Sequence, residues 1–192
     1  MIEIPANALV LLIGAAGAGK STLASRLFPA EAILSSDTLR GELSGDPANQ
    51  AASARAFRTL HTRAAGRLAA GRLTVIDATN IAAVARRPLR RLAAAHDRPV
   101  VALVLDLPPA VCLGRNAARV DRTVPEAVIE RQLAGLRRTL DEGQLAAERL
   151  DRIVVLTDSA AVDGTTVGLT LPARAATLSS SALPRRTRRP NP

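Results

Sequence analysis

Aromatic residues are almost absent from this sequence of 192 residues, which contains two phenylalanines and neither tryptophan nor tyrosine. Proteins that stack nucleic-acid bases on aromatic side chains, such as OB-folds and RNA recognition motifs, rely on several exposed aromatics. The scarcity of aromatics argues against this mode of binding. Any contact with nucleic acid must therefore work through arginine side chains and backbone amides.

Cysteine and histidine are also scarce, which restricts the disulfide and metal chemistry of the chain. Cys112 is the single cysteine, so neither an intramolecular disulfide nor a cysteine-based zinc cluster can form. The two histidines, His61 and His96, are too few for a multi-histidine metal site. All three residues lie in segments with a helical pattern. We expect the cysteine to be buried and inert, and the histidines to be packing or surface residues.

The sequence shows no secretory signal, because no basic region precedes its first apolar run. That run, Ala8–Ile13, is far too short to cross a membrane. We therefore expect a soluble protein of the cytoplasm that makes no membrane contact.

The net charge of +9 comes from 26 basic and 17 acidic residues, and Lys20 is the one basic residue that is not arginine. Residues 164–192 hold five arginines and no acidic residue. The regular alternation of apolar and helical patterns also ends near this point. The sequence therefore predicts one domain over residues 1–160 and a disordered basic tail, rich in Ser, Pro and Arg, over residues 161–192.

Short apolar runs alternate with helical patterns along the predicted domain. The runs predict strands at Ala8–Ile13, Ala32–Leu34, Leu73–Ile76, Val100–Leu107 and Ile153–Leu156. The segments between them predict helices at Ser21–Phe28, Pro47–Ala70, Ile81–Ala95, Pro108–Arg119 and Pro125–Leu140. Strands that are apolar throughout and alternate with helices are typical of a parallel sheet covered on both faces. The predicted fold is therefore α/β, with a five-stranded parallel sheet, and Pro88 should delay or kink its helix.

A candidate phosphate-binding loop follows the first predicted strand and precedes the first predicted helix. The segment GAAGAGKS from Gly14 to Ser21 matches the pattern GxxxxGK[ST]. Small residues let the backbone N–H groups wrap around a phosphate, and the helix N-terminus adds a favourable dipole. The alternative is a tight turn without a ligand. The predicted nucleotide-binding residues are Gly14, Ala15, Ala16, Gly17, Ala18, Gly19, Lys20, Ser21 and Thr22.

Within such a loop, the lysine and the hydroxyl residue have distinct chemistry. Lys20 can reach the β- and γ-phosphates of ATP, and the hydroxyl of Ser21 can ligate Mg²⁺. The dinucleotide fingerprint GxGxxG is excluded, because Ala16 stands where that pattern needs a glycine. The loop therefore indicates a nucleoside triphosphate with its magnesium ion.

Two acidic residues follow the second and third predicted strands, where ligands bind in open parallel sheets. Asp37 could accept the proton of an attacking hydroxyl, or it could cap the helix that follows it. Arg40, one helical turn later, could neutralise a phosphate. Asp77 could hold Mg²⁺ through water, or it is a turn residue at a strand end. Thr79 and Asn80 are weaker candidates for contact with the substrate.

Three arginines follow the fourth predicted strand, and a continuous helix would gather them on one face: Arg115, Arg119 and Arg122. Guanidinium groups match phosphate oxygens in pairs and stay charged. A mobile segment that carries them could close over the nucleotide as a lid and exclude water. The alternative is a solvated helix face in a chain rich in arginine.

Together, these segments resemble the kinase module of the bacterial polynucleotide kinase–phosphatase RNA-repair enzymes, within the wider group of P-loop kinases. The resemblance covers residues 8–157 and is carried by GAAGAGKSTLA from Gly14, SSDTLRG from Ser35, GRLTVIDATN from Gly71, ARRPL from Ala85, VCLGRNAARVDR from Val111 and VIERQ from Val128. The phosphate loop alone is generic. The combination of SSDxxRG, DATN and RNxxRxxR is much more specific.

The resemblance implies a fold and a role for the matching residues. Lys20 and Ser21 would handle the nucleotide phosphates and Mg²⁺. Asp37 would be the general base for a polynucleotide 5′-hydroxyl, and Arg40 would bind a phosphate on the acceptor side. Lid arginines on the ATP phosphates are implied at Arg115, Arg119 and Arg122. The implied order of the five predicted strands is 2-3-1-4-5.

We therefore expect an ATP-dependent kinase that phosphorylates the 5′-hydroxyl of a polynucleotide. A ligase would need a nucleophilic lysine besides Lys20, and a metallophosphatase would need a cluster of His and Asp, so we expect the kinase step alone. One alternative is a kinase of the same group that acts on a small-molecule alcohol. Another is an ATP-dependent switch or nucleic-acid-binding module. Asp37 and Arg40 argue against the switch, which needs no base on the acceptor side.

Overall fold

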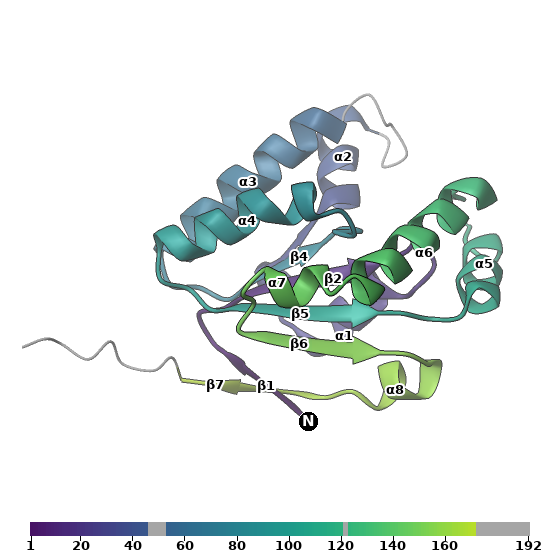
Figure 1. Ribbon diagram of the computed structural model, residues 1–192. Helices are drawn as coiled ribbons and strands as arrows, with labels where there is room; N and C mark the ends of the chain where they lie inside the picture. Colours follow the sequence, from purple (N-terminus) through teal and green to yellow (C-terminus); the bar gives the residue numbers. More distant parts are fainter. Residues whose placement is uncertain (46–52, 121–122, 172–192) are drawn as a thin grey trace, which may run out of the picture.

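The computed structural model describes residues 1–45, 53–120 and 123–171, which form a layered α/β arrangement (Figure 1). The elements in chain order are β1 (Ile2–Pro5), β2 (Leu9–Gly14), α1 (Lys20–Leu27), the 3₁₀ helix η1 (Ala30–Ala32), β3 (Ile33–Ser35), α2 (Ser36–Ser44), α3 (Ser53–Ala69), β4 (Thr74–Asp77), α4 (Ala83–Ala95), β5 (Val100–Leu105), α5 (Pro109–Ala117), α6 (Glu126–Asp141), α7 (Gln144–Ala147), β6 (Arg152–Leu156), α8 (Ser159–Gly164) and β7 (Val167–Thr170).

The middle layer is a parallel sheet of five strands in the order β3-β4-β2-β5-β6. These are the five predicted strands, displaced by no more than two residues at either end, and their order confirms the prediction. The register pairs Ser35 of β3 with Asp77 of β4, and Asp77 with Leu12 of β2. The carboxyl ends of these three strands therefore lie together at one edge of the sheet.

Both faces of the sheet are covered, which explains why its strands are apolar throughout. Leu9, Leu11 and Ile13 of β2 pack against α2, α3, α4, α6 and α7. Val10 and Leu12 face the opposite side, where they pack with residues of α1 and β1. All five side chains are fully buried. Figure 1 shows α3 and α4 above the sheet and α1 behind it.

A separate two-stranded parallel sheet pairs β1 with β7, and the sequence did not predict it. Both strands are short, and β1 contains Glu3 and Pro5, so neither stands out as an apolar run. The predicted boundary at residue 160 is wrong, because α8 and β7 continue the ordered structure to Thr170. Residues 172–192 of the predicted tail lie outside the described residues.

The helices agree with the predictions in position but differ at their ends. The helix predicted from Ile81 begins at Ala83 and runs through Pro88, so the proline does not delay it to that point. The helix predicted to reach Arg119 ends at Ala117. Residues 47–52 of another predicted helix fall outside the described residues. Among the helices that the structure describes, none is long and apolar enough to cross a membrane.

Candidate active site

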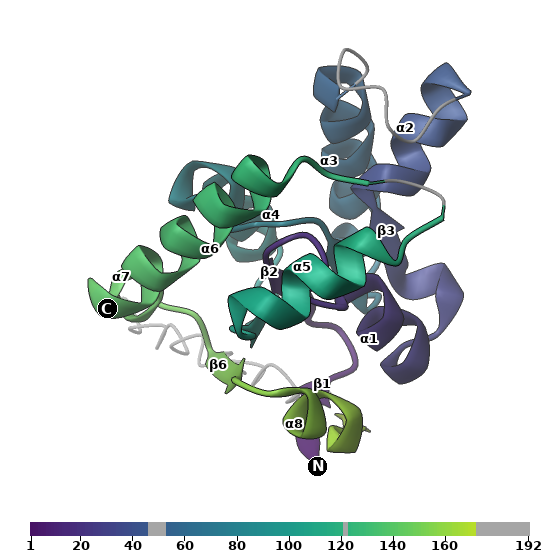
Figure 2. The ribbon, with the colours of Figure 1, turned by 90° about the vertical axis from the view of Figure 1, so that its right-hand side faces the viewer.

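The loop between β2 and α1 folds tightly against α5 at the carboxyl edge of the sheet (Figure 2). Gly17 has a φ of 78°, and a β-carbon there would lie 2.1 Å from the carbonyl oxygen of Cys112. Gly19 has a φ of 91° and precedes α1 without a side-chain cap. Both positions therefore require glycine. The first N–H groups of α1 are left to meet an anion, as the predicted phosphate-binding loop requires.

Lys20 is buried beneath this loop, and its side chain ties the end of the loop back to its first two residues. Nζ donates hydrogen bonds to the carbonyl oxygens of Gly14 at 2.9 Å and Ala15 at 2.7 Å. Burial lowers the pKa of Lys20 to about 8, against the opposing effect of the carboxylates of Asp77 and Asp37. The charge of Lys20 therefore lies within electrostatic reach of both acidic residues that the sequence predicted.

Ser21 and Asp77 meet directly at the first turn of α1. The hydroxyl of Ser21 donates a hydrogen bond to Oδ2 of Asp77 at 2.7 Å. Asp77 is buried at the end of β4, where strand pairing fixes its backbone. The predicted magnesium ligands are thus adjacent, and they offer the oxygen atoms that Mg²⁺ prefers. Thr22 follows in α1 with an exposed side chain.

Asp37 and Arg40 form an ion pair within α2. Asp37 does not cap this helix. The N-cap is Ser35, whose hydroxyl accepts a hydrogen bond from the backbone N–H of Thr38 at 3.5 Å. The side chain of Arg40 is 6% exposed, whereas that of Asp37 is 41% exposed. Arg40 is therefore a buried anchor for a carboxylate that an incoming substrate can reach.

The three arginines of the predicted lid do not share one helix, and their role as a lid stays a prediction. Arg115 of α5 lies on the phosphate loop, where it donates to the carbonyl oxygen of Ala18 at 3.4 Å and to the hydroxyl of Ser159 at 3.0 Å. Arg119 lies beyond the end of α5, so the predicted continuous helix face is wrong. Its positive charge nevertheless opposes protonation of Lys20 and lowers the pKa of that lysine. Arg122 lies outside the described residues.

Thr79 and Asn80, the weaker candidates, hold the loop after β4 in place. The carbonyl oxygen of Thr79 accepts a hydrogen bond from the backbone N–H of Gly14 at 3.1 Å. Asn80 is buried with a φ of 48°, and its Nδ2 donates to the carbonyl oxygen of Leu12 at 2.8 Å. These bonds tie the loop to β2 and the phosphate loop, so both residues support the site's backbone.

Gln132 of α6 contacts the phosphate loop, although the sequence analysis assigned it no role in the site. Its Oε1 accepts a hydrogen bond from the backbone N–H of Ala16 in the phosphate loop at 2.8 Å. Ile129 and Leu136, three residues before it and four after it, are buried. A polar residue in the buried stripe of an amphipathic helix was the available signal. Cys112, as expected, is buried, and burial raises the pKa of its thiol.

Arg86 is a polar residue on the buried face of α4, and it holds the loop between β4 and α4 in place. The guanidinium of Arg86 is fully buried and pairs with Glu148, which follows α7. Its Nη1 also donates to the carbonyl oxygens of Asn80, at 2.8 Å, and Ile81. Arg86 therefore anchors the loop between β4 and α4 to the segment that follows α7.

A phosphate loop after the central strand β2, an acidic residue at the end of β4 and this order of parallel strands define the fold of P-loop kinases. A family model described as an AAA domain, AAA_33, matches residues 9–140, and the chain belongs to that family. A search of curated protein sequences finds no match. The resemblance inferred from the sequence motifs is thus confirmed for fold and family.

Solved structures of several kinds share this fold. A chain of the Pnkp1/Rnl/Hen1 RNA repair complex matches with a TM-score of 0.61 and 20% identity, over 74% of this chain and 47% of that chain. The AvrRxo1-ORF1:-ORF2 complex with ATP matches with a TM-score of 0.62 and 17% identity, over 78% and 54%. A sugar kinase from Janibacter sp. matches with a TM-score of 0.54 and 24% identity, over 78% and 84%. This chain spans about half the length of the first two.

Proposed function

We propose that this protein is an ATP-dependent kinase of the cytoplasm that transfers the γ-phosphate of ATP, with Mg²⁺, to the 5′-hydroxyl of a polynucleotide. The observation that carries this proposal is the convergence of two carboxylates on one lysine. Pairing of β3 with β4 sets Ser35 beside Asp77, so Asp37, two residues after Ser35, lies at the same sheet edge as Asp77, which bonds Ser21 next to Lys20. The charges of Asp77 and Asp37 also oppose the lowering of the Lys20 pKa by burial. The residue that reaches the phosphates, the acid of the metal site and an accessible acid for the acceptor thus share one neighbourhood.

The nucleotide and its metal would be held at the phosphate loop. The hydroxyl of Ser21 and the carboxylate of Asp77 would hold Mg²⁺, which neutralises charge on the β- and γ-phosphates when it is bound. The N–H groups at the start of α1 would hold the β-phosphate. Lys20 and Arg115, whose side chains both bond carbonyl oxygens of the loop, would stabilise the charge of the phosphoryl group in transfer.

Asp37 would act on the acceptor. Its carboxylate accepts the proton of the attacking hydroxyl while the hydroxyl oxygen forms a bond to the γ-phosphorus. The bond from the γ-phosphorus to the β–γ bridging oxygen breaks, and ADP leaves. Arg40 orients the carboxylate through their ion pair. Its burial holds that orientation, which suits catalysis by positioning.

A small-molecule alcohol is the second candidate acceptor. The similarity in fold to the Janibacter sugar kinase supports it, while the similarity to a chain of an RNA repair complex supports the polynucleotide. The SSDxxRG, DATN and RNxxRxxR segments favour the polynucleotide. The two candidates share the nucleotide site and differ only on the side of Asp37.

One labelling experiment separates these functions. The protein is incubated with γ-labelled ATP, Mg²⁺ and one of three acceptors: a 5′-hydroxyl oligonucleotide, a panel of small alcohols, or water alone. We expect label on the oligonucleotide. Label on a small alcohol alone would transfer the proposal to the second candidate. Release of phosphate with no labelled acceptor in any salt condition would instead identify an ATP-dependent switch.

A matched pair of variants tests the role of Asp37. Asp37→Asn should abolish transfer and leave the dissociation constant of ATP within about twofold, because general-base catalysis contributes about 10²–10⁴-fold. Glu42→Gln is the control, since Glu42 is an exposed carboxylate of the same helix, paired with Arg63. Transfer that survives in Asp37→Asn would reduce Asp37 to a structural partner of Arg40.

A further inference from the structure

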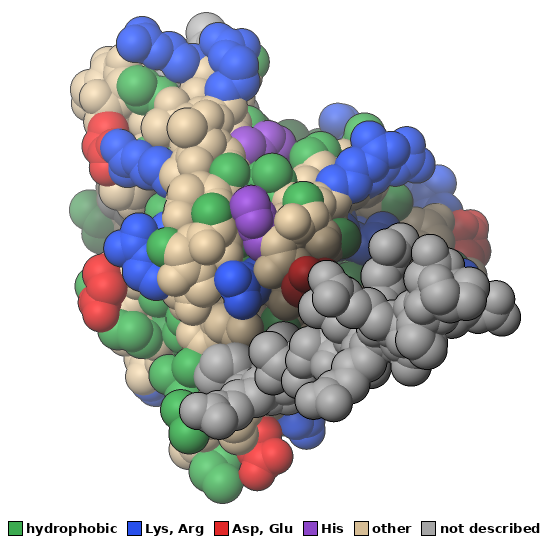
Figure 3. Space-filling view, turned by 90° about the vertical axis from the view of Figure 1, so that its left-hand side faces the viewer, with side chains coloured by type: hydrophobic (Ala, Val, Ile, Leu, Met, Phe, Trp, Pro, Cys, Tyr) green, Lys and Arg blue, Asp and Glu red, His purple; other side chains and the backbone are tan. Residues whose placement is uncertain are grey.

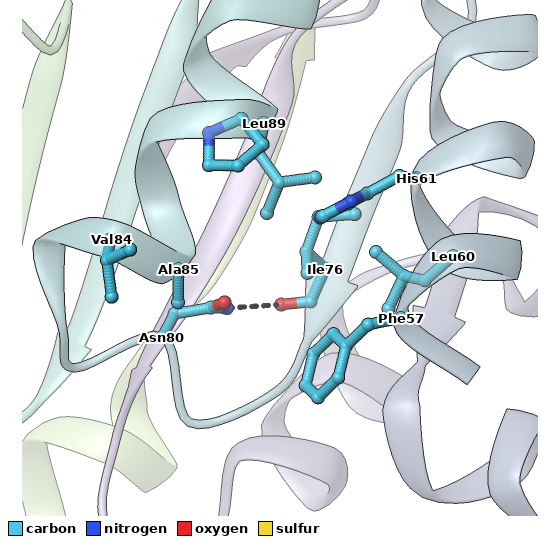
Figure 4. A pocket seen from close by; sticks show the side chains of 9 residues that line it. Phe57, Leu60, His61, Ile76, Asn80, Val84, Ala85 and Leu89 are labelled. Atoms are coloured by element: carbon cyan, nitrogen blue, oxygen red, sulfur yellow. Dashed lines mark hydrogen bonds between the residues drawn. The ribbon is translucent and has the colours of Figure 1, made fainter. Parts of the chain in front are cut away.

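A mostly apolar pocket opens between α3 and α4 (Figure 4). Its cavity volume is about 290 Å³. Phe57, Leu60 and His61 line it from α3, and Ile76 of β4 lies at its base. The remaining lining residues are Asn80, Val84, Ala85, Pro88 and Leu89. His61 and Asn80 are therefore the only polar side chains among the nine that form its walls.

The pocket adjoins the candidate active site on the acceptor side. Ile76, which lines the pocket, belongs to the same buried cluster as Leu39 of α2, whereas Asp77 alternates to the opposite face of β4 and bonds Ser21 of α1. Asn80 is bonded to β2 at Leu12, two residues before the phosphate loop. The helix that supplies Phe57 packs against α2, which carries Asp37. The pocket and the accessible carboxylate thus lie at the same edge of the sheet.

The chemistry of the walls selects the kind of group that can enter. A sugar or polyol would lose the hydration of several hydroxyls and gain few hydrogen bonds, which disfavours its burial here. A phosphate would meet no cation among the nine lining residues. A planar ring would pack its faces against apolar side chains and the ring of Phe57. Functional pockets for whole ligands begin near about 300 Å³, so this one suits a single ring system.

His61 gives the pocket a means of reading the edge of such a ring. It is half-buried, and burial lowers the pKa of its imidazole. A neutral imidazole has one donor and one acceptor nitrogen. Phe28, the other phenylalanine of the chain, is buried in the core, so Phe57 is the one aromatic side chain that can stack on a ligand. One base can therefore be held, whereas the composition argues against platforms that stack several bases.

We propose that this pocket binds an uncharged planar ring of the phosphate acceptor, of the nucleobase class, and so selects acceptors that carry a base beside their hydroxyl. This inference rests on the proposed kinase function. The base of a terminal nucleoside would enter between α3 and α4, and the 5′-hydroxyl of the same nucleoside would face Asp37. A free nucleoside and the end of a polynucleotide share this chemistry.

A pocket-filling variant and a pair of acceptors test the proposal. Ala85→Phe fills the pocket from α4, and Ala94→Phe is the control, since Ala94 is exposed on the same helix. The acceptors are an oligonucleotide with an intact 5′-terminal nucleoside and the same oligonucleotide with an abasic 5′-terminal residue. For the wild type, kcat/KM should be at least about tenfold higher with the base, the effect of one base–aromatic stack. Ala85→Phe should remove this preference, and Ala94→Phe should retain it.

Equal use of the two acceptors by the wild type would overturn the proposal, as would an unchanged preference in Ala85→Phe. Direct binding separates this failure from failure of the kinase function. With the nucleotide site saturated by a non-hydrolysable ATP analogue, adenosine and uridine should perturb the NMR signals of His61, and ribose should not. Ala85→Phe should abolish the effect. Nucleoside binding without oligonucleotide phosphorylation would support base binding in the pocket and assign it to free nucleosides. It would reject the polynucleotide as the phosphate acceptor. Absence of both would reject the pocket.

Discussion

The side chain of Gln132 accepts a hydrogen bond from the backbone N–H of Ala16 at 2.8 Å, although 116 positions separate them in the sequence. Ala16 belongs to the phosphate loop, and Gln132 lies near the middle of α6. Ser21 and Asp77 bind on the other side of the same loop. The loop is therefore held between α6 and β4, which fixes its backbone before a nucleotide arrives.

Removal of the Gln132 side chain should loosen the phosphate loop. We expect Gln132→Ala to weaken ATP binding by about twofold to tenfold, because a net hydrogen bond of about 0.5–1.5 kcal/mol is removed from an organised loop. Gln132→Glu should weaken it further, since the added charge would lie beside the phosphates. Isothermal titration with ATP and Mg²⁺ measures both effects. Gln144→Ala, whose side chain bonds Glu142 at the surface, is the control.

The protonation of Lys20 should control how ATP affinity depends on pH. Burial sets the pKa of its ammonium at about 8, and only the charged form attracts phosphate. ATP affinity should therefore fall as the pH rises through this value, by about tenfold between pH 7 and pH 9 for a single linked proton. Titrations across this range measure the change. In Lys20→Arg the guanidinium stays charged, so a similar fall would assign the pH dependence to another group.

The buried pair of Arg86 and Glu148 should be costly to break. Glu148→Gln leaves the guanidinium of Arg86 buried without its counter-charge, which should lower the free energy of unfolding by about 3–5 kcal/mol. Urea denaturation measures this loss. The exposed pair of Arg63 and Glu42 is the matched control, and Glu42→Gln should cost about 0–1 kcal/mol. Equal losses in the two variants would contradict a structural role for Arg86.

Residues 172–192 should strengthen binding of a polynucleotide, since they carry five arginines and no acidic residue. On the face in Figure 3, the described Lys and Arg side chains form separate groups with other residues between them. Deletion of 172–192 should weaken oligonucleotide binding and reduce its salt dependence by about 0.7 in log–log slope for each phosphate that these arginines neutralise. Phosphorylation of a free nucleoside should not change. A variant with these arginines replaced by glutamine tests charge separately from length, and an unchanged slope would exclude a role for residues 172–192 in binding.

Prediction from the sequence worked best where one pattern decides the outcome. The apolar run of β2 and the glycines after it are sufficient to locate the phosphate loop, because a strand covered on both faces and a phosphate cradle each need a narrow choice of residues. Asp77 was located by the same logic, as the first polar residue after a buried strand. Residues that a single local pattern specifies were thus predicted well.

Two kinds of feature could not be predicted from the sequence: contacts between distant segments, and the choice between two residues that can each cap the same helix. Ser35 and Asp37 can each cap a helix, and only the backbone geometry shows that Ser35 does so. Gln132 is polar on a buried stripe, but its partner is a backbone group on another element. The spacing of Arg115 and Arg119 suits a helix, yet α5 ends between them at Ala117. Each of these outcomes depends on backbone geometry or on a distant group, which a local pattern does not specify.

The pairing of β1 with β7 has a consequence for the order in which the chain is made. β1 is synthesised long before β7, so its strand hydrogen bonds must wait until almost all of the described chain has emerged. The five-stranded sheet needs none of those bonds, and all its strands precede β7. The nucleotide site can therefore assemble during translation, and the pairing of Ile4 with Leu169 is a late event that closes the domain.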